Sequence, residues 1–304
     1  MIRSRTLISL LGGLMLSFTA HAGKLALVID DFGYRPAEEN QILQMSPQIS
    51  VSVLPDAPHS HEMAVKAHQL GHEVIIHLPM APLSKQPLEK NTLTPEMSSA
   101  EVARIIQEAV NKVPFAVGLN NHQGSKMTSS LSGMQKVMQA LDHYNLYFLD
   151  SMTIAGSQSI PAAQGTHVRI LKRRVFLDDS QNEADIRQQF QRAVKLAQRD
   201  GYAIAIGHPH PTTVRVLRAM LPNLPADVTL VRPSQLLNEP QRGTTASAST
   251  HPTSPVKPQP ARFKAPGLCV TRQPIAPVPA TRMLSVIAES IAQSPLYKKL
   301  ADLF

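Results

Sequence analysis

The sequence predicts an α/β protein, with a parallel sheet of seven or eight β–α units closed into a barrel. Short apolar segments alternate with longer amphipathic segments from Lys24 to about Asn238, as expected for strands inside and helices outside. This number of repeated units favours a barrel over an open sheet. Polar side chains also recur where predicted strands end, which is where parallel α/β folds usually place their chemistry.

The individual elements follow from the apolar pattern and from capping residues. The predicted strands are Leu25–Ile29, Ile49–Leu54, Glu73–His77, Ala116–Leu119, Tyr147–Leu149, Arg174–Phe176, Ala203–Ile206 and Val228–Val231. The predicted helices are Ala37–Gln44, Ser60–Leu70, Ser99–Lys112, Ser132–His143, Glu183–Asp200 and Thr212–Leu221. Ser98-Ser99 and Thr212-Thr213 are suitable N-caps for two of them.

The two ends of the chain differ from residues 23–238, which we assign to the barrel. Residues 1–22 resemble a secretory signal, with Arg3 and Arg5 before an apolar core and Ala20-His21-Ala22 as a cleavage site. We therefore expect a periplasmic or secreted protein with no membrane span after cleavage; the alternative is an uncleaved anchor. Residues 239–280 are rich in Pro, Ser and Thr and predict a disordered linker. Residues 281–304 predict a short helical tail, either frayed or docked on an envelope protein or membrane surface.

The composition of the chain excludes a disulfide framework and argues against nucleic-acid binding. The single cysteine, Cys269, excludes an internal disulfide framework. The net charge of +8 is consistent with attraction to an anionic surface or polymer, although much of the excess lies in the two ends. No basic patch is interleaved with aromatic residues, so nucleic-acid binding is not expected.

Asp30-Asp31 is the most informative pair of residues. Two like charges at the end of a buried strand need a cation, a proton or a hydrogen-bond network to compensate them. The alternative is a solvated turn with a helix N-cap. Because neighbouring strand residues point in opposite directions, the two carboxylates are expected to differ in role, with Asp31 as a metal ligand and Asp30 as a general base. The same divergence makes them a poor glycosidase pair.

Histidines at other strand ends complete a candidate metal site. His77 ends the third predicted strand and His122 follows the fourth. Together with Asp31 they form a carboxylate and two imidazoles, a set that suits Zn²⁺ or a similar divalent ion and leaves one position open for water; Zn²⁺ is the expected metal. Alternatively, His77 is a core histidine and His122 a turn residue. His208, after the strand Ala203–Ile206, is a candidate proton donor to a leaving group, with His210 as the alternative.

Several segments together resemble the divergent polysaccharide deacetylase family, a branch of the carbohydrate esterases. They are Leu27–Gly33, Gly71–Met80, Gly118–Ser125, Phe148–Ser151, Phe176–Asp178 and Ile206–Pro209. The resemblance implies a distorted (β/α) barrel of about seven strands and a metal-dependent deacetylase site. It implies that Asp30 is the base, that Asp31 and His77 are metal ligands, and that His208 is the acid. Ordinary deacetylases have a second histidine four residues after the first; here that position is Ala81, and His122 is the natural substitute.

The predicted function is therefore an exported metal-dependent hydrolase that removes acetyl groups from an N-acetylated polysaccharide or cell-wall glycan. Five further residues are expected to orient the catalytic groups or bind substrate: Asn121, Ser125, Asp150, Asp178 and His210. The alternative is a carbohydrate-binding or envelope-organising protein that keeps the scaffold without the chemistry. The absence of tryptophan and of a histidine at position 81 favours the alternative.

Overall fold

The structure is a computed structural model that describes residues 22–239. Most of the predicted signal peptide, the linker and the C-terminal tail lie outside the described residues. The strands are β1 (Gly23–Phe32), β2 (Ser50–Val53), β3 (Val74–Met80), β4 (Ala116–Gln123), β5 (Tyr147–Asp150), β6 (Ile170–Lys172), β7 (Val175–Phe176), β8 (Tyr202–Gly207) and β9 (Val228–Val231). The α-helices are α1 (Pro36–Leu43), α2 (Ser60–Gln69), α3 (Ser99–Lys112), α4 (Ser125–Ser129), α5 (Leu131–Leu141), α6 (Ser159–Ala162), α7 (Glu183–Asp200) and α8 (Pro211–Met220).

All eight predicted strands and all six predicted helices are present, with ends shifted by a few residues. The sequence did not predict β6, α4 and α6, which have three to five residues each. Ser98 caps α3 as predicted, because its side chain accepts a hydrogen bond from the Glu101 amide. The proposed Thr212-Thr213 cap is wrong, since α8 begins at Pro211 and its N-cap is His210.

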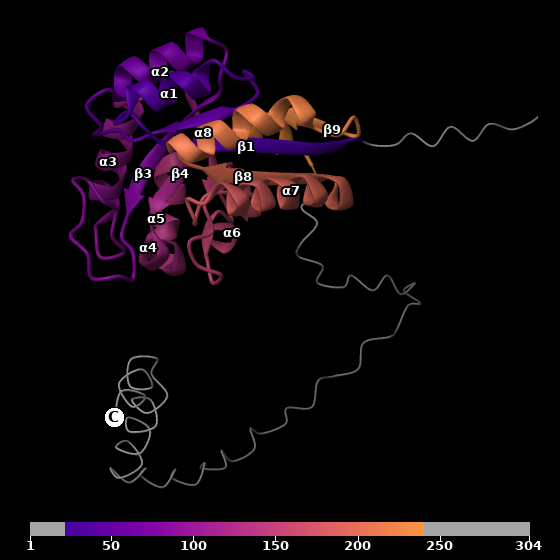
Figure 1. The fold of residues 1–304 in the computed structure, drawn as a ribbon. Helices are drawn as coiled ribbons and strands as arrows, with labels where there is room; N and C mark the ends of the chain where they lie inside the picture. Colours follow the sequence, from indigo (N-terminus) through magenta and orange to yellow (C-terminus); the bar gives the residue numbers. More distant parts are fainter. Residues whose placement is uncertain (1–21, 240–304) are drawn as a thin grey trace, which may run out of the picture. The chain divides into compact units, whose positions relative to one another are not determined.

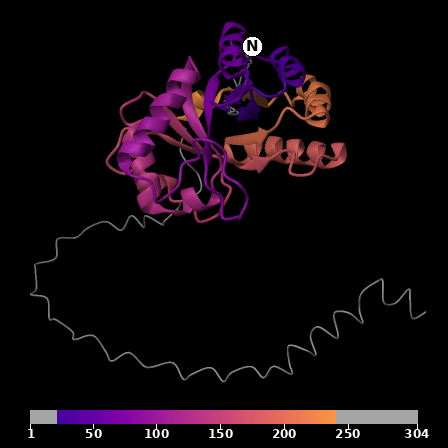
Figure 2. The same cartoon turned by 90° about the vertical axis from the view of Figure 1, so that its left-hand side faces the viewer.

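The sheet is parallel throughout and strongly curled. Its strand order is β6-β5-β4-β3-β2-β1-β8-β7, and β9 pairs with the first residues of β1. Only Arg173 and Arg174 separate β6 from β7, although these strands lie at opposite ends of that order. The Arg173 amide donates to Asp150 of β5, and the Arg174 amide donates to Ile204 of β8. The sheet therefore curls until its ends meet, as expected for a distorted barrel, with the helices outside it (Figures 1 and 2).

Strand alternation divides the core into two layers. Leu25, Leu27 and Ile29 of β1 pack outward in the large cluster beneath the helices. Ala26 and Val28 point inward and form a smaller cluster inside the curl with residues of the other strands, including Ile75, Leu149 and Ile206. The inward-facing positions continue along each strand and reach Asp30, His77, Ser151 and His208 at the strand ends. Period-two geometry thus aims several polar side chains at one rim of the barrel.

Among residues 22–239, no helix is both long enough and apolar enough to cross a membrane.

Candidate metal centre

A β-bulge at the end of β1 brings both aspartates to the same place. The pairing of β1 with β2 shifts register between Ile29 and Phe32, and Asp31 has a positive φ of 60°. Asp30 Oδ2 lies 3.5 Å and Asp31 Oδ1 lies 3.3 Å from the same atom, His77 Nε2. The expectation that the two side chains diverge is therefore wrong, because regular alternation does not continue through a bulge.

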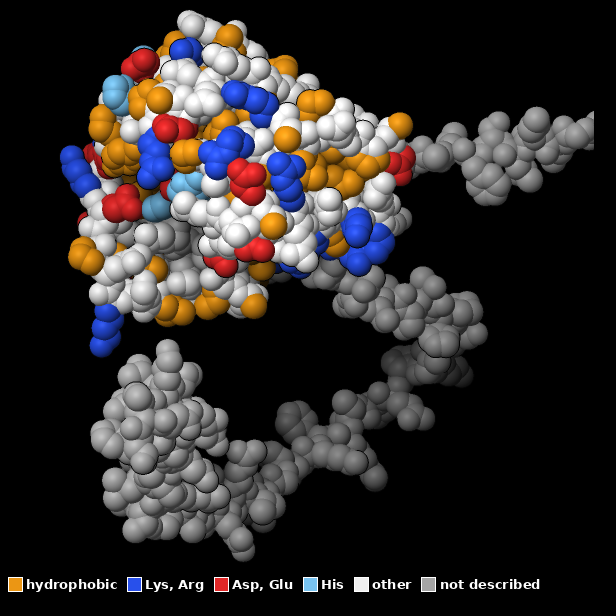
Figure 3. Space-filling view, in the orientation of Figure 1, with side chains coloured by type: hydrophobic (Ala, Val, Ile, Leu, Met, Phe, Trp, Pro, Cys, Tyr) orange, Lys and Arg blue, Asp and Glu red, His pale blue; other side chains and the backbone are white. Residues whose placement is uncertain are grey.

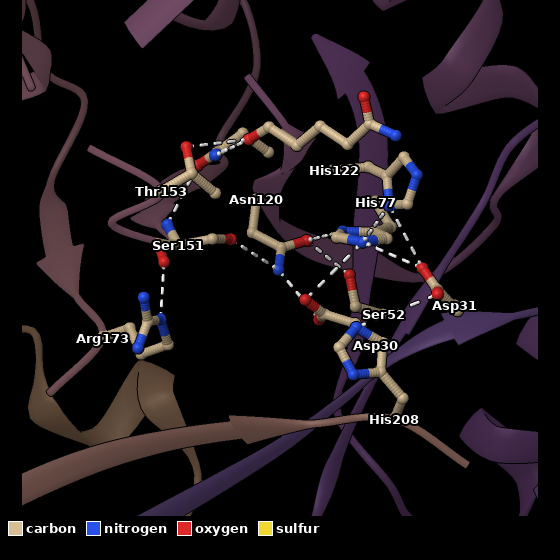
Figure 4. Close-up of polar contacts among 12 residues, drawn as sticks. Asp30, Asp31, Ser52, His77, Asn120, His122, Ser151, Thr153, Arg173 and His208 are labelled. Carbon is tan, nitrogen blue, oxygen red and sulfur yellow. Dashed lines mark hydrogen bonds and ion pairs between the residues drawn. The ribbon is translucent and has the colours of Figure 1, made fainter. Parts of the chain in front are cut away.

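Asp31, His77 and His122 form a compact triangle of donor atoms, and Figure 4 shows them converging. His77 Nε2 lies 3.0 Å from His122 Nδ1 and 3.3 Å from Asp31 Oδ1, and the third side, His122 Nδ1 to Asp31 Oδ1, is 3.2 Å. Ligands about 2.0–2.1 Å from a tetrahedral ion are separated by roughly 3.3 Å. The triangle therefore has the size that a tetrahedral divalent ion requires of three of its ligands.

The outer ring nitrogens of both histidines have hydrogen-bond acceptors. His77 Nδ1 lies 2.7 Å from Asn120 Oδ1, and His122 Nε2 lies 3.0 Å from Glu89 Oε1. When the outer nitrogen of each ring donates to its acceptor, the inner nitrogen is left with a lone pair that faces the triangle. Such outer partners fix the tautomer and orientation of metal-binding histidines.

The donor set fits a divalent metal. Two imidazole lone pairs and one carboxylate oxygen face one another, an arrangement that is repulsive without a cation. Asp31 Oδ1 is buried and makes no hydrogen bond within residues 22–239.

Asn120 joins the predicted base to the predicted metal histidine. It is fully buried, and the pairing of β3 with β4 places it directly beside His77. Its Nδ2 donates to Asp30 Oδ1 at 2.9 Å, and because a carboxylate only accepts, its Oδ1 must face His77. Ser52 and Ser151 also bond to it (Figure 4). Burial raises the pKa of Asp30, although the nearby His77 and His208 oppose this, and a raised pKa suits a general base.

His208 lies beside the triangle, directly after β8 (Figure 4). Its Nε2 lies 3.8 Å from Asp31 Oδ2, and its Nδ1 lies 3.0 Å from Asp178 Oδ1. Burial alone would lower the pKa of His208, but Asp178 raises it to about 9. His208 is therefore protonated at neutral pH, and its Nε2–H is free to donate.

Asp178, His208 and His210 make up a second group of potential metal ligands. Both oxygens of Asp178 already accept hydrogen bonds: Oδ1 from the His208 ring, and Oδ2 from the His208 amide and the Thr213 hydroxyl. The carboxylate thus orients His208, which is one of the two roles predicted for it.

Asn121, Ser125 and Asp150 lie near the rim but do not line its pocket. Asn121 bonds to main-chain atoms of Gln123 and Ser151, and Ser125 accepts from a loop amide. Asp150 accepts hydrogen bonds from the loop after β5 and from Ser159 at the start of α6, and none of these bonds involves a histidine. These three side chains shape the loops around the site, and their predicted contact with substrate stays a prediction.

A pocket of about 340 Å³ opens over the triangle, and we refer to it as the rim pocket. Its lining residues are Asp31, Tyr34, Arg35, Leu54, Glu89, His122, His208, Pro209 and His210. Figure 3 shows histidine side chains at the surface among both acidic and basic side chains. Asn120 and Glu89, which complete the site, were not among the predicted site residues.

The curled parallel barrel, with its carboxylates and histidines at the rim, is the basis for assigning the protein to a family. The chain belongs to the divergent polysaccharide deacetylase family, whose sequence profile matches residues 27–237. The resemblance based on the sequence motifs is thereby confirmed.

Two relatives and one solved structure show how far the similarity extends. The chain is 65% identical over 284 residues to the uncharacterized protein YibQ of Escherichia coli strain K12, covering 93% of this chain and 88% of that protein. It is 43% identical over 215 residues to an uncharacterized protein of Haemophilus influenzae, covering 71% and 77%. The crystal structure of the uncharacterized protein ATU2773 from Agrobacterium tumefaciens C58 has a TM-score of 0.66 at 19% identity, covering 72% of this chain and 90% of that one. The last similarity supports the fold alone.

Proposed function

We propose that this protein is an exported, metal-dependent hydrolase that removes acetyl groups from an N-acetylated glycan. The observation that supports this most strongly is the triangle of Asp31, His77 and His122, with Asp30 and His208 next to it. Membership of a deacetylase family agrees with it.

The residues divide the chemistry in a simple way. A divalent ion such as Zn²⁺, held by the triangle, would acidify a water molecule and polarise the acetyl carbonyl. Asp30, held by Asn120, takes a proton from the attacking water. His208 donates the proton on its Nε2 to the nitrogen as the C–N bond breaks, which yields acetate and a free amine.

The alternative function is carbohydrate binding without catalysis. Its main support is Ala81, which occupies the place of a metal histidine in ordinary deacetylases. Ala81 is buried, and its carbonyl oxygen accepts hydrogen bonds from the amides of Lys126 and Met127. His122 provides a third donor from the neighbouring strand, so a three-donor set is present without residue 81.

Metal content and acetate release test the proposal. The purified protein is analysed for bound metal and incubated with chitooligosaccharides or peptidoglycan fragments plus Zn²⁺, Co²⁺ or Mn²⁺. We expect acetate release that Asp30→Asn abolishes, and metal content that His77→Ala and His122→Ala abolish. Glycan binding without release, unaffected by Asp30→Asn, would support the alternative. Export is tested separately, by sequencing the N-terminus of the protein from fractionated cells and looking for a start near Gly23.

A further inference from the structure

The rim pocket contains an arginine that the proposed chemistry does not use. Arg35 follows β1 and lines the pocket together with His122 and His208. Its side chain makes no hydrogen bond and no ion pair with any residue from 22 to 239. Every other arginine in that range bonds to a carboxylate, a side-chain carbonyl oxygen or a main-chain carbonyl oxygen. Among the described residues, the Arg35 side chain is thus unpaired, and it lies in the same pocket as the reacting groups.

A buried carboxylate holds the loop that presents Arg35. Glu39 of α1 is fully buried, and its Oε1 accepts hydrogen bonds from three successive main-chain amides, those of Gly33, Tyr34 and Arg35, at 2.9, 3.0 and 2.6 Å. These bonds fix the backbone of the turn while the Arg35 side chain stays free. The exposed Arg35 guanidinium therefore starts from a fixed position and keeps its N–H donors available to an anion.

The surroundings favour an anion attached to a ring. Tyr34, on the same turn, is 53% exposed and lines the rim pocket, so one face of its ring can contact an apolar surface of the substrate. β1 and β8 are adjacent, so Arg35 shares its side of the pocket with His208 and His210. The acids of the lining have partners elsewhere, because Asp31 faces the metal histidines and Glu89 bonds to His122.

We propose that Arg35 binds a carboxylate borne by the substrate, so that the preferred substrate is an acidic N-acetylated sugar whose ring packs against Tyr34. This substrate class rests on the proposed function, because it places the carboxylate beside the acetamide that is cleaved. Arg35 pairs with a carboxylate through two parallel N–H···O bonds, which gives geometric specificity as well as affinity.

Two probes that differ in one negative charge test whether Arg35 recognises the substrate carboxylate. The probes are the disaccharide of N-acetylglucosamine and N-acetylmuramic acid, which bears one carboxylate, and its methyl ester, which is neutral and nearly the same shape. We expect kcat/KM for the acid to exceed that for the ester about tenfold or more, as for a hydrogen bond to a charged group. Arg35→Gln should abolish this preference, mostly through KM. Arg192→Gln, which changes an exposed arginine of α7 outside the rim pocket, should retain it. The same probes are also tested for binding by calorimetry on the metal-loaded protein.

The two measurements separate the possible failures. Equal use and equal binding of acid and ester by the unaltered protein, or a preference that survives in Arg35→Gln, overturns the carboxylate subsite. If neither probe releases acetate but the acid binds more tightly in an Arg35-dependent way, the hydrolytic function fails and the subsite stands. Tyr34→Ala should weaken binding of both probes alike, whereas Tyr34→Phe should not.

Discussion

Replacing Asn120 tests whether the metal histidine and the base are held by one amide. In Asn120→Ala, His77 Nδ1 and Asp30 Oδ1 each lose a buried partner, at 2.7 Å and 2.9 Å. Loss of the outer partner of a metal histidine typically weakens metal binding 10–100-fold, and we expect a loss of about that size for zinc. Each buried group left unpaired also costs about 1–3 kcal/mol. For the two groups together, we therefore expect the free energy of unfolding to fall by about 2–6 kcal/mol.

Asn120→Asp separates the two roles of the side chain. It keeps an oxygen acceptor for His77 Nδ1 but places a second carboxylate where an N–H now donates to Asp30. Zinc affinity should stay close to that of the unaltered protein, while acetate release falls by at least about 100-fold because the pKa of Asp30 rises further. Zinc affinity is measured by competition with a chromophoric chelator, and stability by urea unfolding.

Asn121→Ala is the matched control, because this buried neighbour bonds only to main-chain atoms of Gln123 and Ser151. It should destabilise the fold but change zinc affinity by well under tenfold. If Asn120→Ala binds zinc as tightly as the unaltered protein does, the positioning role of Asn120 is refuted.

Three further predictions test the acid, the outer ligand shell and the core. Asp178 raises the pKa of His208 to about 9, and only the protonated ring can donate, so kcat/KM should fall as the pH rises above about 9. In a pH–rate profile, Asp178→Asn should move this decline to lower pH by about one to two units. A decline at the same pH would refute the pairing of Asp178 with His208. Glu89→Ala should weaken zinc binding about tenfold, whereas Glu89→Gln, which keeps an acceptor for His122 Nε2, should be nearly neutral in the same chelator competition. Gly118→Ala should lower stability to urea by about 1–3 kcal/mol, because a Cβ there would lie 2.5 Å from the buried ring of Tyr147; unchanged stability would mean that the ring moves freely.

Much of the fold could be predicted because its signals are local. Short continuous apolar runs such as Leu25–Ile29 and capping residues such as Ser98 depend only on neighbouring residues. β6 was not recognised because Ile170–Lys172 contains only two apolar residues, and its pairing with β5 depends on contacts distant in sequence.

The site was harder to predict than the fold. The predicted fourth strand ends at Leu119, with the polar residues that follow placed beyond the strand and a turn left open as the alternative for His122. In fact β4 continues to Gln123, and strand alternation then places Asn120 and His122 on one face. The bulge at Asp31 depends on a positive φ at a residue that is not glycine, for which the sequence has no reliable signal. Glu89 lies in a long loop whose path depends on tertiary contacts.

The short junction at Arg173 and Arg174 has a consequence for motion. β6 and β7 contain only three and two residues, and each pairs with one neighbour, β6 with β5 and β7 with β8, so few main-chain hydrogen bonds hold either end of the sheet. Amides in such a region need the least free energy to open and should exchange with deuterium sooner than those of β1 and β8. The Arg173 guanidinium donates to the carbonyl oxygens of Ser151 and Met152, and the Ser151 hydroxyl bonds to Asn120. Local opening at this junction would therefore loosen the support of His77 while the rest of the barrel stays folded.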